Sequence, residues 1–234
     1  MGTTWEELEA RAMTYIKDDL SLQYDMKNRL PVFYNRMRAY MTEAIPLFNR
    51  PPEMLERLSG YTEPAFASVS YETEDGISAG DSIETGTVGA DLCAVGVIAE
   101  DEYGDVNYQP FSAFSYDPET GNVTIEQDMA GAVLLDIDLY TSGSFDKELN
   151  ETEKGILAFA VYNRYEHRFD NNVLERTAKI RDSSFSTISE ASQTQANTAR
   201  QRLVDSQLFD MMRAYQDNAE WRRVVKNGGM PWLS

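Results

Sequence analysis

Apolar residues in the first sixty positions recur at helical spacing. Leu8, Ala12, Ile16 and Leu20 follow one another at about one helical turn, which predicts a single amphipathic helix. Thr4, with a glutamate three residues later, predicts where this helix begins, because the threonine hydroxyl can accept a hydrogen bond from an unpaired backbone amide.

Two further helices are predicted before residue 60. Pro31 suits a first helical turn because its φ is fixed, and Pro46 ends the helix because it has no N–H to donate. A short third helix is predicted between the prolines at 51–52 and Gly60, a residue type common just after a helix end. The apolar positions of the second helix are Phe33, Met37, Tyr40, Met41 and Ala44.

The pattern changes to the period of a β-strand after residue 61. In residues 133–140 the odd positions are apolar, whereas the even positions include two aspartates and are expected to be mostly solvated. The sequence DPETG at 117–121 predicts a tight turn between strands at 111–116 and 122–127, because proline presets φ and glycine accepts a positive φ. Five or six such strands predict a small antiparallel β-sandwich or barrel.

Two other segments complete this middle region. Residues 92–99 are apolar and β-branched, which predicts another strand. Residues 76–91 are rich in Gly, Ser, Thr and acids, and they are expected to form one long loop.

Helical spacing returns at Asn150, which together with Glu153 predicts a helix start. Residues 156–162 are apolar on every side, as expected for a helix in the middle of a bundle. The asparagines at 171–172 are predicted to interrupt this helix, and the Asn-Gly-Gly sequence at 227–229 is predicted to end a long terminal one. The apolar stripe of the terminal helix is Val204, Leu208, Met211 and Tyr215.

The sequence therefore predicts an α+β protein. Helices from residues 1–60 and 149–226 are expected to pack together as a bundle, with a β module at 61–148 inserted between them and a tail at 227–234.

Charge divides the chain in the same way. No Lys or Arg occurs from residue 58 to 146, yet this stretch holds eighteen Asp and Glu and so accounts for the whole net charge of −18. The remaining residues hold 21 basic and 21 acidic side chains (39 − 18), so the helical frame is expected to neutralise itself. Such acidity argues against recognition of nucleic-acid phosphates and against docking on anionic lipid.

The expected location is the cell interior or a particle assembled there. The first residues are acidic, with no apolar segment of a signal peptide behind them. The longest apolar run, 156–162, is too short to cross a bilayer. Cys93 is the single cysteine, so no intramolecular disulfide can form.

The acidic residues suggest calcium, but no spacing matches a calcium-binding loop. The candidates Asp101, Glu102 and Asp105, or Asp117 and Glu119 in the predicted turn, lack the alternating acids of an EF-hand. A solvated turn is the more common interpretation of such residues.

Catalytic chemistry has little support in the sequence. A hydrolase with two carboxylates is a third-ranked hypothesis, because nothing distinguishes one acidic pair from the others. His167 is the only histidine, and Cys93 lies in an apolar strand. We therefore expect neither an enzyme nor a cofactor.

Two regions are candidates for subunit contacts. Trp232 and Leu233 follow a flexible Gly-Gly, and tryptophan is a favoured interface anchor, although a frayed end is an equally simple interpretation. The terminal helix has a polar face that includes Gln193, Gln195 and Asn197. This face is suited either to a neighbouring polar surface or to water.

Residues 148–215 resemble the head–tail connector (neck) proteins of tailed bacteriophages. The resemblance lies in the sequence TEKGILA at 152–158, which enters an apolar helix, and in DSSF at 182–185 followed by Ser189 and Ala191 at the start of a long helix. In those relatives an acidic β module precedes such a helix pair.

The resemblance implies a homo-oligomeric ring, often a dodecamer, that joins portal to tail in the virion. DNA would pass through its channel without specific binding, portal and tail or neck proteins would be partners, and assembly would take place in the host cytoplasm. The alternative is a β-sandwich module that recognises carbohydrate or a host surface, with or without calcium. Tyr103, Tyr108 and Tyr116, if exposed, support that alternative.

Overall fold

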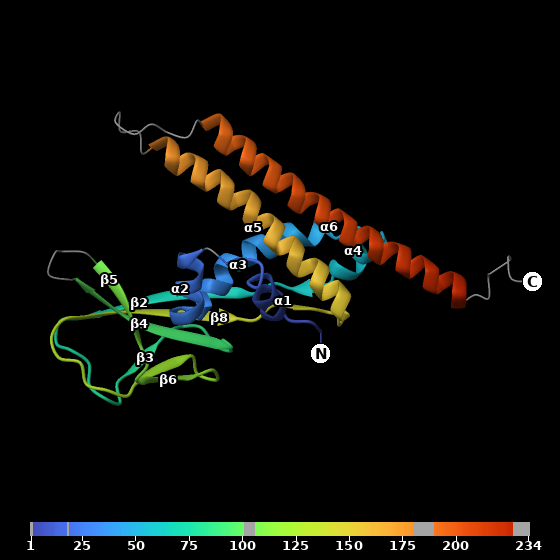
Figure 1. Cartoon of the computed structure of the whole chain (residues 1–234). Helices are drawn as coiled ribbons and strands as arrows, with labels where there is room; N and C mark the ends of the chain where they lie inside the picture. Colours follow the sequence, from blue (N-terminus) through green and yellow to red (C-terminus); the bar gives the residue numbers. More distant parts are fainter. Residues whose placement is uncertain (1, 18, 101–105, 180–189, 227–234) are drawn as a thin grey trace, which may run out of the picture.

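The computed structural model describes residues 2–17, 19–100, 106–179 and 190–226, and its fold is α+β. Helices from both ends of the chain pack together, and small antiparallel sheets are inserted between them in sequence. Figure 1 shows the N-terminal helices lying between the sheets and a long helical hairpin. The predicted fold class is confirmed.

The N-terminal segment begins with a capped helix, as predicted, because the Thr4 hydroxyl accepts a hydrogen bond from the Glu7 amide. The expected single helix through Leu20 is wrong. The first helix ends at Ala12, and Asp19 starts a second one by accepting a 2.9 Å hydrogen bond from the Leu22 amide, which leaves Leu20 79% exposed. The elements of this segment are α1 (Trp5–Ala12), α2 (Leu20–Asn28), α3 (Leu30–Ala44), η1 (Ile45–Leu47) and α4 (Glu53–Leu58).

The inserted strands form two main sheets and one short pair, all antiparallel. The four-stranded sheet has the order β2 (Ala65–Thr73), β8 (Val133–Thr141), β4 (Leu92–Glu100) and β5 (Val106–Phe111). The three-stranded sheet has the order β3 (Ser82–Glu84), β7 (Asn122–Ile125) and β6 (Phe114–Asp117). The short pair is β1 (Tyr61–Thr62) with β9 (Ser144–Phe145).

The two main sheets share one apolar core, to which Val123 and Ile125 contribute from β7 and Leu135 and Ile137 from β8. The predicted turn at 117–121 joins β6 to β7, and Gly121 adopts the positive φ of 74° that the turn requires. The segment expected to be one long loop contains a strand, β3, because Ile83 reaches this core.

The second face of β8 is not solvated, contrary to the alternation in its sequence. Helix α3 packs on this side of the four-stranded sheet, where Tyr34 stacks on Tyr140 with ring centroids 5.4 Å apart. Asp138, on the same face, is only 1% exposed. The sheet is therefore covered on both faces, by the three-stranded sheet on one and by the N-terminal helices on the other.

The chain ends in two long helices, α5 (Glu151–Lys179) and α6 (Glu190–Lys226), which run side by side in Figure 1. The predicted cap of α5 is confirmed, because the Glu153 amide donates to Asn150 Oδ1 at 3.0 Å and Glu153 Oε2 accepts from the Asn150 amide at 2.8 Å. The predicted interruption at 171–172 is wrong. Asparagine lowers the stability of a helix only modestly, and α5 continues through both residues.

Candidate functional site

The acidic surface of the inserted sheets is the first candidate site. The expectation that the frame neutralises only itself is wrong at three acids, because Arg29 pairs with Asp136 and Asp138, and Arg38 pairs with Glu63. Within the described residues, no other acid of the insert forms a salt bridge with the frame. The exposed acids include Glu72, Glu74, Asp75, Asp81, Glu84, Asp117, Glu119, Glu126 and Asp128.

Arg29 joins the helices to the four-stranded sheet. It lies between α2 and α3, and its Nη2 is 2.7 Å from Asp138 Oδ2 and 2.5 Å from Asp136 Oδ2. Its guanidinium also lies over the ring of Tyr108, 4.1 Å from the centroid. Burial raises the pKa of Asp138, and the hydrogen bond from Arg29 opposes that rise. Arg29 therefore compensates the negative charge of the buried Asp138, whereas the charges of the exposed acids named above have no cation of the frame beside them within the described residues.

The tyrosines that supported a recognition module are not free. Tyr108 is half-buried beneath Arg29. The Tyr116 hydroxyl donates to the Thr87 carbonyl at 3.1 Å and accepts from the Ala90 amide at 3.3 Å. Tyr103 lies outside the described residues. The expectation of exposed aromatic side chains is wrong for both described tyrosines, so this alternative loses its best support.

The calcium candidates within the described residues, Asp117 and Glu119, form no metal site. Asp101, Glu102 and Asp105 lie outside the described residues. Asp117 accepts hydrogen bonds from the Thr120 hydroxyl at 2.7 Å and from the Glu119 amide at 2.9 Å. These bonds, that from Thr120 foremost, lower the pKa of Asp117. In the part of the chain that the structure describes, no group of three or more His, Cys, Asp or Glu side chains is placed to hold a metal ion.

Neither His167 nor Cys93 is arranged as a nucleophile with a base. His167 Nε2 lies 2.9 Å from Asp205 Oδ1, which also accepts from Asn163 Nδ2 at 2.7 Å, so this group joins α5 to α6. Burial raises the pKa of Cys93 to about 12, and the thiol is therefore not ionised at neutral pH.

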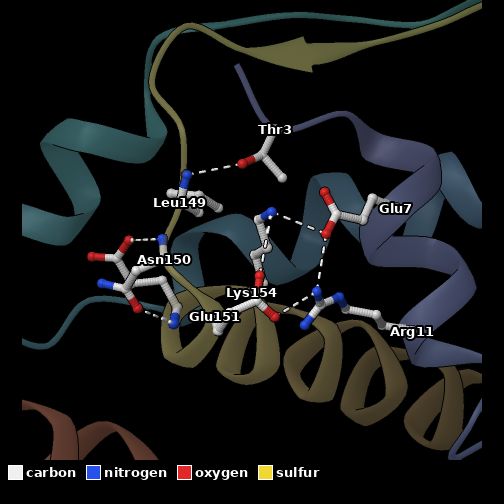
Figure 2. A network of polar contacts seen from close by, with 8 residues as sticks. Thr3, Glu7, Arg11, Leu149, Asn150, Glu151 and Lys154 are labelled. Atoms are coloured by element: carbon white, nitrogen blue, oxygen red, sulfur yellow. Dashed lines mark hydrogen bonds and ion pairs between the residues drawn. The ribbon is translucent and has the colours of Figure 1, made fainter. Parts of the chain in front are cut away.

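The first turn of α5 lies in a polar network with α1 (Figure 2). Glu7 Oε1 is 3.0 Å from both Lys154 Nζ and Arg11 Nη2, and Arg11 Nη2 is 2.7 Å from Glu151 Oε2. The Thr3 hydroxyl accepts from the Leu149 amide at 2.8 Å on the same side of α5. These contacts fix the start of α5 against α1.

Beside this network lies a pocket of about 480 Å³ between the start of α5 and the second half of α6. Glu151 is the single carboxylate among the described residues that line it, and its side chain is 76% exposed. No histidine or cysteine lines it within the described residues. The pocket therefore lacks the paired acids that a hydrolase needs.

A second polar cluster connects three helices through Glu153, whose side chain is fully buried. Glu153 Oε1 accepts from Arg57, just before the end of α4, and from the Tyr215 hydroxyl of α6 at 2.5 Å. The sequence predicted Glu153 as a cap for α5 but gave no indication of these two partners.

The candidate interface residues fall partly outside the described residues, as do Trp232 and Leu233. Gln193 lies in α6, but its side chain is not described. Gln195 is exposed and Asn197 is half-buried near the start of α6. Their role in a subunit contact stays a prediction.

The end of α6 beyond Tyr215 is an exposed surface that the sequence pattern was not taken to predict. The buried stripe of α6 consists of Val204, Leu208 and Met212 and goes no further. Beyond it, Trp221 is 54% exposed and Val224 42% exposed. The signal in the sequence was the end of the four-residue apolar spacing after Tyr215.

Glu9 on α1 is a buried acid without a partner. It is 0% exposed, and neither carboxylate oxygen has a hydrogen-bond partner among the described residues. Burial, and then the charge of Glu6, raise the pKa of Glu9 well above its usual value. Burial also raises the pKa of two facing phenols, Tyr34 on α3 and Tyr140 on β8. The Glu9 carboxyl therefore keeps its proton at a pH where an exposed glutamate is ionised.

Glu9→Gln is expected to stabilise the protein by about 1–3 kcal/mol at pH 8 and to have little effect at pH 4. Because the folded protein binds this proton more tightly than the unfolded chain does, wild-type stability falls as pH rises above the unfolded pKa. Thermal unfolding at several pH values measures the difference. Glu56→Gln, on the exposed surface of α4, is the control. If Glu9→Gln unfolded with the same pH dependence as the wild-type protein, the conclusion that Glu9 is protonated in the folded state would be contradicted.

The comparisons with known proteins identify no family. No protein-family model matches this chain, and neither does any curated protein. Among the described residues, no helix is both long enough and apolar enough to span a membrane.

Proposed function

We propose that the protein is a structural component of the neck of a tailed bacteriophage, a homo-oligomeric ring that joins portal to tail. Support comes from the resemblance of residues 148–215, of which 152–158 lie in the first turns of α5 and Ala191 is the second residue of α6. In this proposal the protein is not an enzyme and needs no cofactor. It is part of the virion and is assembled in the host cytoplasm.

The observation that carries this proposal is the unpaired acidic surface of the insert. Strands β2 and β4 both run antiparallel to β8 and therefore end at the same edge of the sheet. At this edge Glu72, Glu74 and Asp75 are exposed, and none forms a salt bridge within the described residues. Copies arranged around a channel would present these acids to DNA, whose phosphates they repel within a Debye length of about 8–10 Å.

Electron microscopy of the purified protein, alone and with a candidate portal, tests the proposal. The expected result is a ring, formed by the protein alone or on the portal, with the ends of β2 and β4 facing the channel. Monomers under both conditions, or a ring with these acids on its outer surface, would contradict it.

A charge reversal tests the role of the acids in the channel. Glu72→Lys with Glu74→Lys is expected to leave the ring intact but to make it retain double-stranded DNA at low salt, because lysines attract the phosphates. Glu56→Lys with Asp210→Lys makes the same charge change at exposed acids of the helical frame that form no salt bridge in the described part of the chain, and is the control. Equal DNA retention by both variants would argue against a channel lined by residues 72–75.

A further inference from the structure

Residues 216–226, the last three turns of α6, meet the rest of the described chain at two places. Arg223 pairs with Glu53 of α4 at 2.9 Å, and Asn218, Ala219 and Arg222 line the pocket beside the start of α5. No described side chain in this segment is buried, and Figure 1 shows the segment extending past the start of α5. We call residues 216–226 the α6 end.

The α6 end has two exposed apolar residues beside two cations, and two acids, Asp217 and Glu220, lie four residues before the apolar pair on the same side. Trp221 and Val224 are three residues apart and lie on one side of the helix, both exposed. Arg222 and Lys226 are four residues apart and lie on an adjacent side. Neither forms a salt bridge within the described residues.

Most arginines elsewhere in the frame are already neutralised by acids of the same chain. Arg57 pairs with Glu153, Arg168 with Glu43, and Arg36 with Asp25. In α6, Arg200 pairs with Glu166 and Arg223 with Glu53. The other cations of this helix form no salt bridge in the described part of the chain: Arg202, Arg213, Arg222 and Lys226. The same helix also holds three exposed acids without a salt bridge in the described part of the chain, Asp210, Asp217 and Glu220, so positive charge exceeds negative charge only locally, at Arg222 and Lys226.

The outer face of the three-stranded sheet is polar and carries two acids, Glu84 and Asp117. Ile83, Val123 and Ile125 point into the shared core, so the residues that alternate with them point outward. The register aligns Glu84, Asn122 and Asp117 in one row, and Ser82, Thr124 and Ser115 in the next. We call these six residues the acidic face.

We propose that the α6 end of one copy docks on the acidic face of a second copy. Arg222 and Lys226 supply the positive charges that Glu84 and Asp117 do not have beside them in the described part of their own chain. Trp221 supplies an aromatic anchor. Figure 1 places the α6 end and the three-stranded sheet at separate ends of the molecule, so the two surfaces cannot meet within one chain.

Such a contact joins two different surfaces and therefore leads from copy to copy, closing into a ring when the rotation between copies permits. The inference rests on the proposed ring and names the surfaces that hold it together. It leaves the edge with Glu72, Glu74 and Asp75 free to face the channel.

Charge reversal on the two surfaces tests this contact. Arg222→Glu with Lys226→Glu is expected to weaken self-association by about ten- to a hundredfold, because two attractions become repulsions. Glu84→Lys with Asp117→Lys is expected to have a similar effect. A chain that combines all four substitutions is expected to associate again, which separates loss of contact from loss of folding. Sedimentation velocity and native mass spectrometry measure the association at low and high salt.

Arg202→Glu with Arg213→Glu is the matched control, since it makes the same charge change on the part of α6 that packs along α5. Hydrogen exchange of the unsubstituted protein is a second measurement, in which the amides of 216–226 are expected to become protected as concentration rises. If every variant formed rings of unchanged stability, and the amides of 216–226 stayed unprotected from exchange, the proposed docking surface would be wrong but the proposed ring would stand. Monomers with and without portal would overturn the proposed function as well.

Discussion

Arg29→Ala is expected to lower the free energy of unfolding by about 3–5 kcal/mol, because it leaves a buried carboxylate without its cation. Asp138 is 1% exposed and receives two hydrogen bonds from Arg29, at 2.7 and 3.1 Å. The Ser68 hydroxyl, 2.9 Å from Asp138 Oδ1, cannot replace the lost charge. Urea unfolding followed by circular dichroism measures the effect.

The loss in Arg29→Ala is expected to depend on pH. Without Arg29, the pKa of Asp138 rises further above its unfolded value, so the folded protein binds a proton that the unfolded chain releases. Stability is then lost progressively as pH rises, and the defect is smaller at pH 4 than at pH 8. Addition of Asp138→Asn is expected to recover part of the loss at neutral pH.

Arg38→Ala is the matched control for Arg29. Its partner Glu63 lies 2.6 Å away, but both side chains are at least one-third exposed, so the expected loss is below about 1 kcal/mol. Equal losses in the two variants would show that burial of the ion pair does not set its contribution.

Glu153→Ala is expected to destabilise the protein by about 3–5 kcal/mol, because it removes the buried acceptor shared by three helices. The cation of Arg57 and the hydroxyl of Tyr215 both lose their partner, and so does the Asn150 amide at the start of α5. Hydrogen exchange is expected to show faster opening of α6 around Tyr215, in addition to a lower melting temperature.

Glu151→Ala provides the comparison for Glu153, because it lies on the same helical turn and also accepts from an arginine. Its side chain is 76% exposed, and its ion pair with Arg11 is therefore expected to contribute less than about 1 kcal/mol. If Glu151→Ala proved as damaging as Glu153→Ala, the polar network with α1 and not the buried cluster would hold α5 in place.

Some contacts of this protein have no local signature in the sequence. The segregation of acids identified the insert, but the pairing of Arg29 with Asp138 joins residues more than one hundred positions apart and has no local signature. The contact of Tyr215 with Glu153, 62 positions apart, also has no local signature. The exposed Trp221 differs in kind, because a break in the apolar spacing of α6 was present in the sequence.

Local patterns alone determined several features of this protein: the cap at Thr4, the reciprocal cap of Asn150 and Glu153, and the turn that closes at Gly121. Each depends on residues within a few positions of one another, where hydrogen-bonding chemistry and φ preferences act directly. Tertiary structure decided which faces are buried. The sequence of β8 alternates as in a half-solvated strand, but α3 packs on its second face. Because α3 covers this face, Asp138 is buried, although the alternation in the sequence predicts a surface acid. The exposure of a residue depends on how distant segments pack against it.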